Sequence, residues 1–172
     1  MTAPSFHVYG LATPLVCSGD DMTAHILAAA ECSESRGLQR GDIVVVAESA
    51  VATAEGRARR LTDIKPSAKA IQLAEDYRMD PRLAEVVLGE SDRIVGGIPG
   101  FLLCMKNGTL LPNAGIDASN APSGSVLLLP LDPDASAARI RAAIAARTGV
   151  DVGVLIVDSR THAMRLGCSG VA

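Results

Sequence analysis

The sequence predicts a mixed α/β fold, with a central mixed sheet, a β-hairpin at 101–113 and flanking helices. The strongest observation is Asn107-Gly108 between two apolar runs, because this dipeptide is the preferred two-residue turn of a hairpin. The second is a pair of Val/Ile-rich runs, 41–49 and 152–157, which are typical of buried strands and are separated by helical patterns. Because hairpins and strand–helix units occur in one chain, a mixed sheet is favoured over a purely parallel one.

The remaining elements follow from capping residues and apolar periodicity. Asp21 precedes a pattern with one apolar helical face, and Ser67 and Asp80 stand at the starts of two further helices. Pro81 suits a first helical turn, and Gly149 follows the last helical pattern. The sequence therefore predicts helices at 22–35, 68–77, 82–91 and 135–148, and a further strand at 126–131.

Length and composition indicate one domain over 1–172. The chain is 48% hydrophobic but only 2% aromatic, so Ala, Val, Leu and Ile must build the core. A mean hydropathy of +0.27 is apolar for a soluble monomer, which favours a buried subunit interface. The net charge of −3 argues against nucleic-acid binding driven by bulk charge.

Targeting features and cysteine spacing bear on location. No apolar run approaches the ~20 residues of a membrane span, and the start MTAPSFHVYG lacks the pattern of a leader peptide. Cys17, Cys32, Cys104 and Cys168 are far apart, which favours reduced thiols over a zinc cluster or a disulfide scaffold. A cytoplasmic protein that does not act on membranes is therefore expected.

Common catalytic motifs are missing from the sequence. It contains no G-x-x-x-x-G-K-[ST], no G-x-G-x-x-G and no G-x-S-x-G. His7, His25 and His162 lack the spacing of metal ligands. The segment LDPDAS (131–136) has the D-x-D form of aspartyl-phosphate hydrolases, with Asp132 as the nucleophile. A helix start with acidic residues in its first turn explains the same pattern and is favoured.

Asp117 and Asp158 are the better candidate pair. Asp158 follows the predicted strand 152–157, and ligands tend to bind at the carboxyl ends of strands. Asp117 lies in the oxygen-rich loop LPNAGIDASN (111–120), and Ser159 adjoins Asp158. Oxygen ligands of these kinds suit Mg²⁺, Mn²⁺ or Ca²⁺. An Asx turn at Asp117 and a strand-end cap at Asp158 are the structural alternatives, and the residues alone leave both open.

Several stretches together resemble one family, the gamma-glutamyl ligases of coenzyme F-420, a deazaflavin hydride carrier. The similarity covers nearly the whole chain, and its most specific parts are NAGIDASN and LDPDxSA. The stretches that carry it are GDIVVVAESAVATAEGR, KPSAKAIQLAE, LPNAGIDASNAPSGSVLLLPLDPDASAARIRAAI and VGVLIVDSRTHAMRLGCSGVA.

The resemblance implies a GTP-dependent amide ligase that adds L-glutamate to the lactyl-phosphate side chain of the deazaflavin precursor. A γ-phosphoryl group would pass to a substrate carboxylate, and the glutamate amine would attack the resulting acyl phosphate. Mg²⁺ or Mn²⁺ would stabilise charge on the phosphoryl oxygens, with K⁺ as a further candidate cofactor. The resemblance also implies a homodimer.

Site residues follow from the resemblance by position. Asp117, Asp158 and Ser159 match metal-binding residues, and Glu48 and Ser49 occupy a metal-contact position after the Val-rich strand. The resemblance assigns no catalytic residue. It implies nucleotide contacts at Thr13, Pro14, Leu15, Val16, Thr53 and Asn120.

The chain departs from the family pattern in three places. Thr53 stands where the family usually has a lysine, so a phosphate-facing ammonium is lost. RTHAMR (160–165) replaces a short Gly-Arg segment, and the chain ends at GCSGVA where family members continue. These departures lead to the expectation of a truncated ligase-like domain, with weak or no ligation alone. The alternatives are a non-catalytic nucleotide- or metal-binding relative, one half of a two-chain ligase, and the phosphohydrolase.

Overall fold

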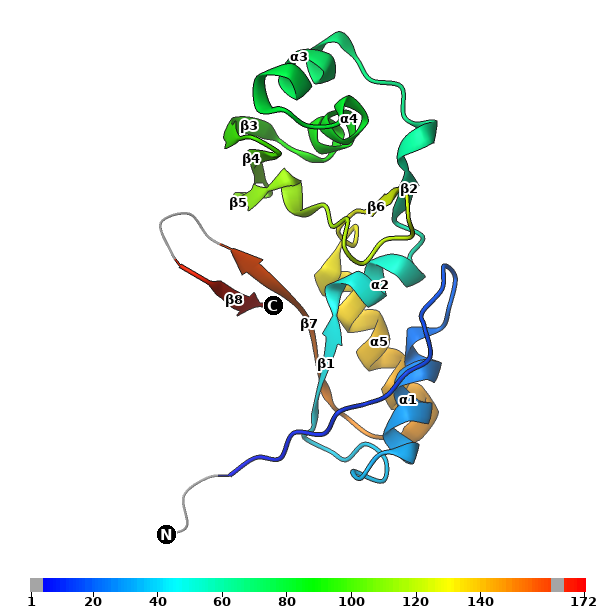
Figure 1. Ribbon diagram of the computed structural model, residues 1–172. Helices are drawn as coiled ribbons and strands as arrows, with labels where there is room; N and C mark the ends of the chain where they lie inside the picture. The colour runs from blue at the N-terminus through cyan, green and yellow to red at the C-terminus, as the bar shows by residue number, and fades with distance from the viewer. Residues whose placement is uncertain (1–4, 162–165) are drawn as a thin grey trace.

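The computed structural model describes residues 5–161 and 166–172, and within them it has a mixed α/β fold, as the sequence predicts (Figure 1). The helices are α1 (Met22–Cys32), α2 (Glu48–Ala54), α3 (Ala68–Tyr77), α4 (Pro81–Glu90) and α5 (Pro133–Thr148). The strands are β1 (Ile43–Ala47), β2 (Ala58–Arg60), β3 (Arg93–Ile98), β4 (Phe101–Lys106), β5 (Thr109–Pro112), β6 (Ser125–Leu127), β7 (Gly153–Thr161) and β8 (Cys168–Val171). Short 3-10 turns, η1 (Leu61–Asp63) and η2 (Asn113–Gly115), follow β2 and β5.

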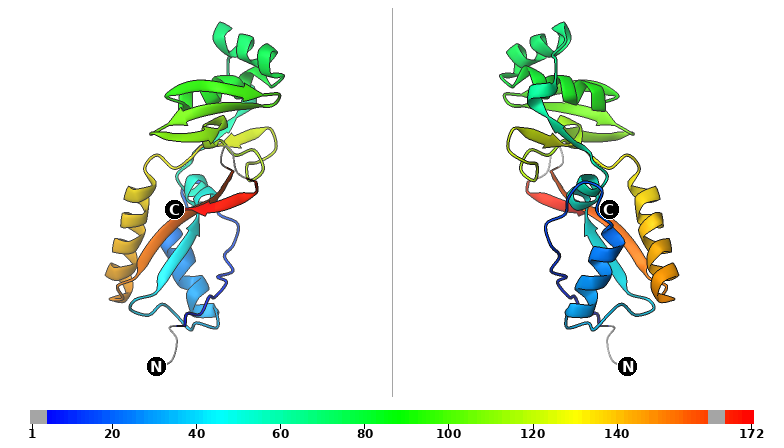
Figure 2. Two further views of the ribbon diagram at one scale, coloured as in Figure 1. Left: turned by 90° about the vertical axis from the view of Figure 1, so that its left-hand side faces the viewer. Right: turned by 90° about the vertical axis from the view of Figure 1, so that its right-hand side faces the viewer.

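One lobe of the molecule contains the sheet β1-β7-β8, and α1 and α5 cover one face of this sheet (Figures 1 and 2). β1 and β7 are parallel, and β8 pairs antiparallel with the second half of β7. Along β1 alternate residues are buried, because only one face of the sheet meets helices. The core between sheet and helices consists of Met22, Ile26, Val44, Val46, Val51, Ile140, Ile144, Val152 and Ile156.

The opposite face of this sheet is apolar and open to solvent. Ile43 is 64% exposed, Val45 59% and Leu155 43%. The sequence-based expectation of two fully buried strands is therefore wrong for this face. A continuous Val/Ile run cannot distinguish a strand covered on both sides from one that presents its second apolar face elsewhere.

The other lobe contains the antiparallel sheet β3-β4-β5, which packs against α3 and α4. Its hairpin turn has φ of 50° at Asn107 and 74° at Gly108, and positive φ at both positions is the geometry of a type I′ turn. The predicted hairpin at 101–113 is confirmed. Two buried clusters form the core of this lobe, and they consist of Ala70, Ala74, Ala84, Val87, Leu102, Cys104 and Ala114.

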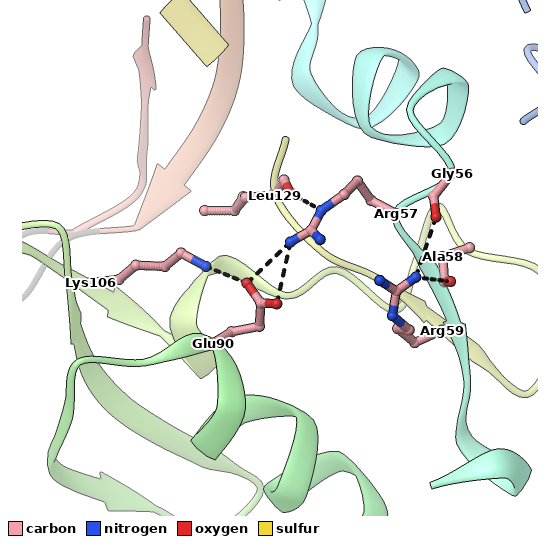
Figure 3. Close-up of polar contacts among 7 residues, drawn as sticks. All are labelled: Gly56, Arg57, Ala58, Arg59, Glu90, Lys106 and Leu129. Atoms are coloured by element: carbon pink, nitrogen blue, oxygen red, sulfur yellow. Dashed lines mark hydrogen bonds and ion pairs between the residues drawn. The ribbon is translucent and has the colours of Figure 1, made fainter. Parts of the chain in front are cut away.

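The two lobes are joined by the two-stranded sheet β2-β6 and by an ionic cluster. Glu90, at the end of α4, accepts hydrogen bonds from Arg57 and from Lys106 of β4 (Figure 3). Arg57 also donates from Nε to the carbonyl oxygen of Leu129, 2.8 Å away. Arg57, which precedes β2, is therefore bonded both to the lobe that contains β3-β4-β5 and to the segment that follows β6.

The helices mostly match the sequence prediction. α3 coincides with 68–77, and α4 and α5 agree with their predicted ranges within two residues at each end. Asp21, Ser67 and Asp80 accept hydrogen bonds from the first turns of their helices, as their capping positions indicate. α1 ends at Cys32 rather than 35, because Ser33 turns its backbone to extended geometry.

Strand limits were predicted less well. β1 ends at Ala47, and Glu48 begins α2, a helix that the range 41–49 concealed. The predicted strand 126–131 shrinks to β6, because its partner β2 has only three residues and Pro130 has no N–H to donate. β7 runs on through Thr161, since β8 pairs with its second half. The prediction that Asp158 follows the end of its strand is therefore wrong.

No helix among residues 5–161 and 166–172 has the length and apolar character needed to span a membrane.

Candidate functional site

The site begins where the parallel pairing of β1 and β7 stops. The last parallel pair is Ala47 with Val157, so the next residues, Glu48 and Asp158, stand side by side at the carboxyl ends of that pair. Asp117 reaches the same place because its backbone pairs with that of Leu127. The N–H of Asp117 donates to the Leu127 carbonyl oxygen at 2.9 Å, and the N–H of Leu127 donates to the Asp117 carbonyl oxygen at 2.7 Å. These carboxylates line one hollow of about 30 Å³, and the other lining residues are Ser49, Ala52, Gly115, Leu127, Leu128 and Leu129.

Glu48 is the most buried of the three carboxylates, with 7% of its surface exposed. Nη2 of Arg160 lies 3.0 and 3.1 Å from its two oxygens. Burial raises the pKa of Glu48, Arg160 opposes this rise, and neighbouring Asp158 adds to it, so the pKa stays above its usual value. A buried acid with raised pKa beside a second carboxylate is the environment in which a further cation is stabilising.

Asp158 and Arg160 share one face of β7, because side chains two residues apart on a strand point the same way. Nε of Arg160 lies 3.4 Å from Oδ2 of Asp158, and Oδ1 accepts the N–H of Ser159 at 2.8 Å. Alternation places the exposed Ser159 side chain on the opposite face, outside the residues that line the hollow. The structure thus brings Asp158 to Glu48 but does not bring the Ser159 hydroxyl there.

The loop around Asp117 is closed by its own carboxylate. Oδ1 accepts the N–H and the hydroxyl of Ser119, both at 2.7 Å, and Oδ2 accepts Nδ2 of Asn120 at 2.6 Å. Partial burial raises the pKa of Asp117, but the hydrogen bonds from Ser119 and Asn120 outweigh it and hold the pKa below its usual value. The Asx turn that sequence reasoning left open is present, and Asp117 still lines the hollow.

Asn113 positions this loop, a role that the sequence prediction missed. Its side chain is buried, and its Oδ1 accepts the N–H of Leu102 at 2.8 Å, although its own φ is +47°. Gly115 has φ of +77°, and a Cβ there would lie 2.8 Å from a methyl of Leu129. An Asn and a Gly flanking one residue were the available signal, since both tolerate positive φ.

The donor chemistry fits a hard divalent cation. Carboxylate oxygens from three separate segments face one small hollow, and Mg²⁺ commonly uses one or two protein carboxylates with water and phosphate oxygens. Over the described ranges 5–161 and 166–172, no group of three His, Cys, Asp or Glu side chains is close enough to hold a metal alone. The cation would therefore depend on ligands from a bound substrate, and on the position of Arg160.

The expected nucleotide contacts are only partly brought together. Asn120 is bonded to Asp117, and Thr53 lies one helical turn from Ser49, with its hydroxyl donating to the Ser49 carbonyl at 2.8 Å. Residues 13–16, within the described range, are outside the set that lines the hollow, and Leu15 is 90% exposed. The N–H of Gly19 bonds the Ala54 carbonyl at 2.8 Å, so this segment runs toward the far end of α2.

The weaker candidates have structural roles. Asp132 accepts the N–H of Ala135 at 2.9 Å and caps α5, as the favoured interpretation of LDPDAS expects. His25 contacts Asp20 at 3.1 Å, and His7 stacks near Tyr9. His162 lies outside the described residues.

A second, larger hollow of about 430 Å³ lies beside the β3-β4-β5 sheet, between it and β7. Thr161 of β7 borders it, three residues beyond Asp158. The other lining residues are almost all apolar: Gly97, Ile98, Phe101, Leu102, Leu103, Leu110 and Pro112. Its volume falls in the range of small-molecule sites.

A family model described as "F420-0:Gamma-glutamyl ligase" matches residues 10–172. The chain belongs to this family. Similar proteins include those named "Coenzyme F420:L-glutamate ligase" from Methanopyrus kandleri, 43% identical over 90% of this chain and 59% of the relative, and from Archaeoglobus fulgidus, 40% identical over 100% and 66%. The namesake from Methanothermobacter thermautotrophicus is 40% identical over 92% of this chain and 63% of the relative. The chain thus spans 59–66% of the length of these relatives, and the predicted resemblance is confirmed.

Proposed function

We propose that this chain carries the phosphoryl and cation site of a GTP-dependent ligase that joins L-glutamate to a coenzyme F-420 precursor through an acyl phosphate. The observation that carries the proposal is the meeting of Glu48, Asp117 and Asp158 around one hollow, in a chain of the gamma-glutamyl ligase family. The names of the relatives supply coenzyme F420 and L-glutamate as the substrates to be joined, and GTP comes from the resemblance to the family.

The carboxylates of Glu48, Asp117 and Asp158 would hold Mg²⁺ or Mn²⁺ together with phosphate oxygens of the nucleotide. When bound, the cation supplies charge stabilisation on the transferred phosphoryl group. Asp117 is kept ionised by the hydrogen bonds from Ser119 and Asn120, so it is a fixed negative ligand at neutral pH. Leu127, Leu128 and Leu129 exclude water from the inner side of the hollow.

The larger apolar hollow supports the acceptor half of the proposal. The two faces of a flat deazaflavin ring are aromatic, and a cavity of about 430 Å³ lined by aliphatic residues and Phe101 suits them. Thr161 lies three residues along β7 from Asp158, about 10 Å, and its side chain is on the opposite face of the strand. A phosphate-containing side chain that passes the edge of β7 would join the two hollows, and the ring and the carboxylate to be activated would then have separate places.

The test is a ligation assay with GTP, L-glutamate and the deazaflavin precursor, followed by mass spectrometry of the acceptor and by GDP release. We expect glutamate-dependent GDP formation that is lost in Asp158→Asn and Asp117→Asn. Phosphate release from a generic phosphoester that depends on Asp132 instead would support a phosphohydrolase and refute the proposal. Because the relatives are longer, the assay is run on this chain alone and on a full-length relative carrying the same substitutions.

A further inference from the structure

Arg160 occupies the position between two of the proposed cation ligands. Its Nη2 lies 3.0 and 3.1 Å from the two oxygens of Glu48, and its Nε lies 3.4 Å from Oδ2 of Asp158. Only 18% of the Arg160 side chain is exposed, and 9% of the Glu48 side chain. One guanidinium thus contacts both carboxylates, of which Glu48 is withdrawn from water and Asp158, 42% exposed, is only half-buried.

The guanidinium of Arg160 offsets the repulsion between the carboxylates of Glu48 and Asp158. Two carboxylates that lie side by side repel each other, and partial burial strengthens that repulsion because water screens it less. A positive charge between them removes the penalty, and either a guanidinium or a divalent cation can supply it. Both would use the same oxygens of Glu48 and Asp158, so they cannot occupy the position together.

The contacts of the Arg160 side chain allow it to leave. Within the described residues its guanidinium donates only to the side chains of Glu48 and Asp158. Movement of the guanidinium therefore breaks the ion pairs but no backbone hydrogen bond. The alternative of a permanent structural salt bridge predicts that loss of Arg160 destabilises the protein and leaves it indifferent to cations.

We infer that Arg160 is a resident counter-ion that competes with a divalent cation for Glu48 and Asp158, so that the cation binds only when the guanidinium swings out. Arg160 then acts as a positioning residue that sets the cation affinity of the site. The inference takes the presence of a divalent cation from the proposed function, but its readout is binding and not ligation.

The experiment is a Mn²⁺ titration of the purified chain, followed by thermal unfolding and by calorimetry, in wild type, Arg160→Gln and Arg160→Lys. We expect Arg160→Gln to be less stable without metal, and to need roughly tenfold less Mn²⁺ for half-saturation, the size of a typical coupling between competing sites. Arg160→Lys keeps a point charge and should fall between the two. Arg141→Gln is the matched control, because Arg141 pairs with exposed Asp151 at 2.8 Å and should leave Mn²⁺ binding unchanged.

Further outcomes decide between the inference and its rival. The gain in Mn²⁺ affinity should vanish when Glu48→Gln is combined with Arg160→Gln. Equal half-saturation in wild type and Arg160→Gln, no Mn²⁺ effect in Arg160→Gln, or a gain that survives Glu48→Gln would each overturn the inference. If Arg160→Gln proves unfolded, Arg160→Lys decides by the same comparison. A protein that gains Mn²⁺ affinity as expected but forms no glutamyl product would leave the inference standing and count against the proposed function.

Discussion

Replacing Glu90 by Gln should weaken the connection between the two lobes of the fold. The Glu90 carboxylate accepts from Nη2 of Arg57 at 3.2 and 3.3 Å and from Nζ of Lys106 at 2.5 Å (Figure 3). The side chains of Glu90, Arg57 and Lys106 are 20%, 13% and 15% exposed. Gln keeps the shape but removes the negative charge, so two largely buried cations face each other without an anion.

The size of the effect follows from this burial. Removing one partner of a fully buried ion pair costs about 3–5 kcal/mol, whereas an exposed pair contributes about 0–1 kcal/mol. With roughly a fifth of the carboxylate open to water, we expect Glu90→Gln to lower the free energy of unfolding by about 2–3 kcal/mol. For a chain of this length, that loss corresponds to a fall in Tm of about 5–10 °C.

The pH dependence has a definite sign. Burial raises the pKa of Glu90, but Lys106 and Arg57 outweigh it, so the folded pKa lies below the usual value. The stabilisation is therefore complete above the unfolded pKa of about 4.3 and is lost as pH falls through the folded pKa. The difference between wild type and Glu90→Gln should be full at pH 7 and should shrink at pH values below about 4.

Urea unfolding followed by circular dichroism measures this difference at each pH. Asp151→Asn is the control, because its pair with Arg141 is more than half exposed and should contribute little. A Glu90→Gln protein within about 0.5 kcal/mol of wild type at pH 7 would refute the reasoning, since that is the range of ordinary surface substitutions.

Three further predictions concern packing, the nucleotide and assembly. Gly97→Ala should lower stability by about 1–3 kcal/mol in thermal unfolding, because its Cβ would lie 2.5 Å from the carbonyl oxygen of Phe101. Gly96→Ala, whose Cβ would meet nothing within 4 Å, should cost far less. Thr53→Lys should tighten GDP binding in calorimetry about tenfold, the effect of one charge-assisted hydrogen bond, while Gln at the same position should not. Light scattering should give twice the chain mass of 17.7 kDa, and Val45→Glu should shift it to the monomer, because Val45 lies on the open apolar face; a wild-type monomer at micromolar concentration would contradict the dimer.

The parts of the fold that could be predicted from sequence are those encoded locally. The turn at Asn107-Gly108 and the caps at Ser67 and Asp80 depend on the conformational preferences of a few adjacent residues, and the structure has them as expected. β3 was missed because RIVGGI contains two glycines and pairs irregularly between Ile94 and Gly96. Such a strand exists through its partner β4 rather than through its own propensity.

The site shows the same division between local and distant determinants. Asp117 was placed in its loop from sequence, since the Asx turn uses Ser119 and Asn120, only two and three residues away. Its meeting with Glu48 depends on the bridge to Leu127 and on the register of β1 against β7, which no local pattern records.

Asp158 was chosen as a candidate ligand for an incomplete reason. Sequence reasoning selected it as the residue that ends a strand, yet β7 continues for three more residues. What ends there is the pairing with β1, so the rule for ligands at strand ends applies to the parallel pair and not to the strand. The continuation matters chemically, because only a strand that runs past Asp158 returns a side chain to the same face two residues later. That residue is Arg160, which the resemblance treated as part of a departure from the family pattern and which the geometry places on both carboxylates.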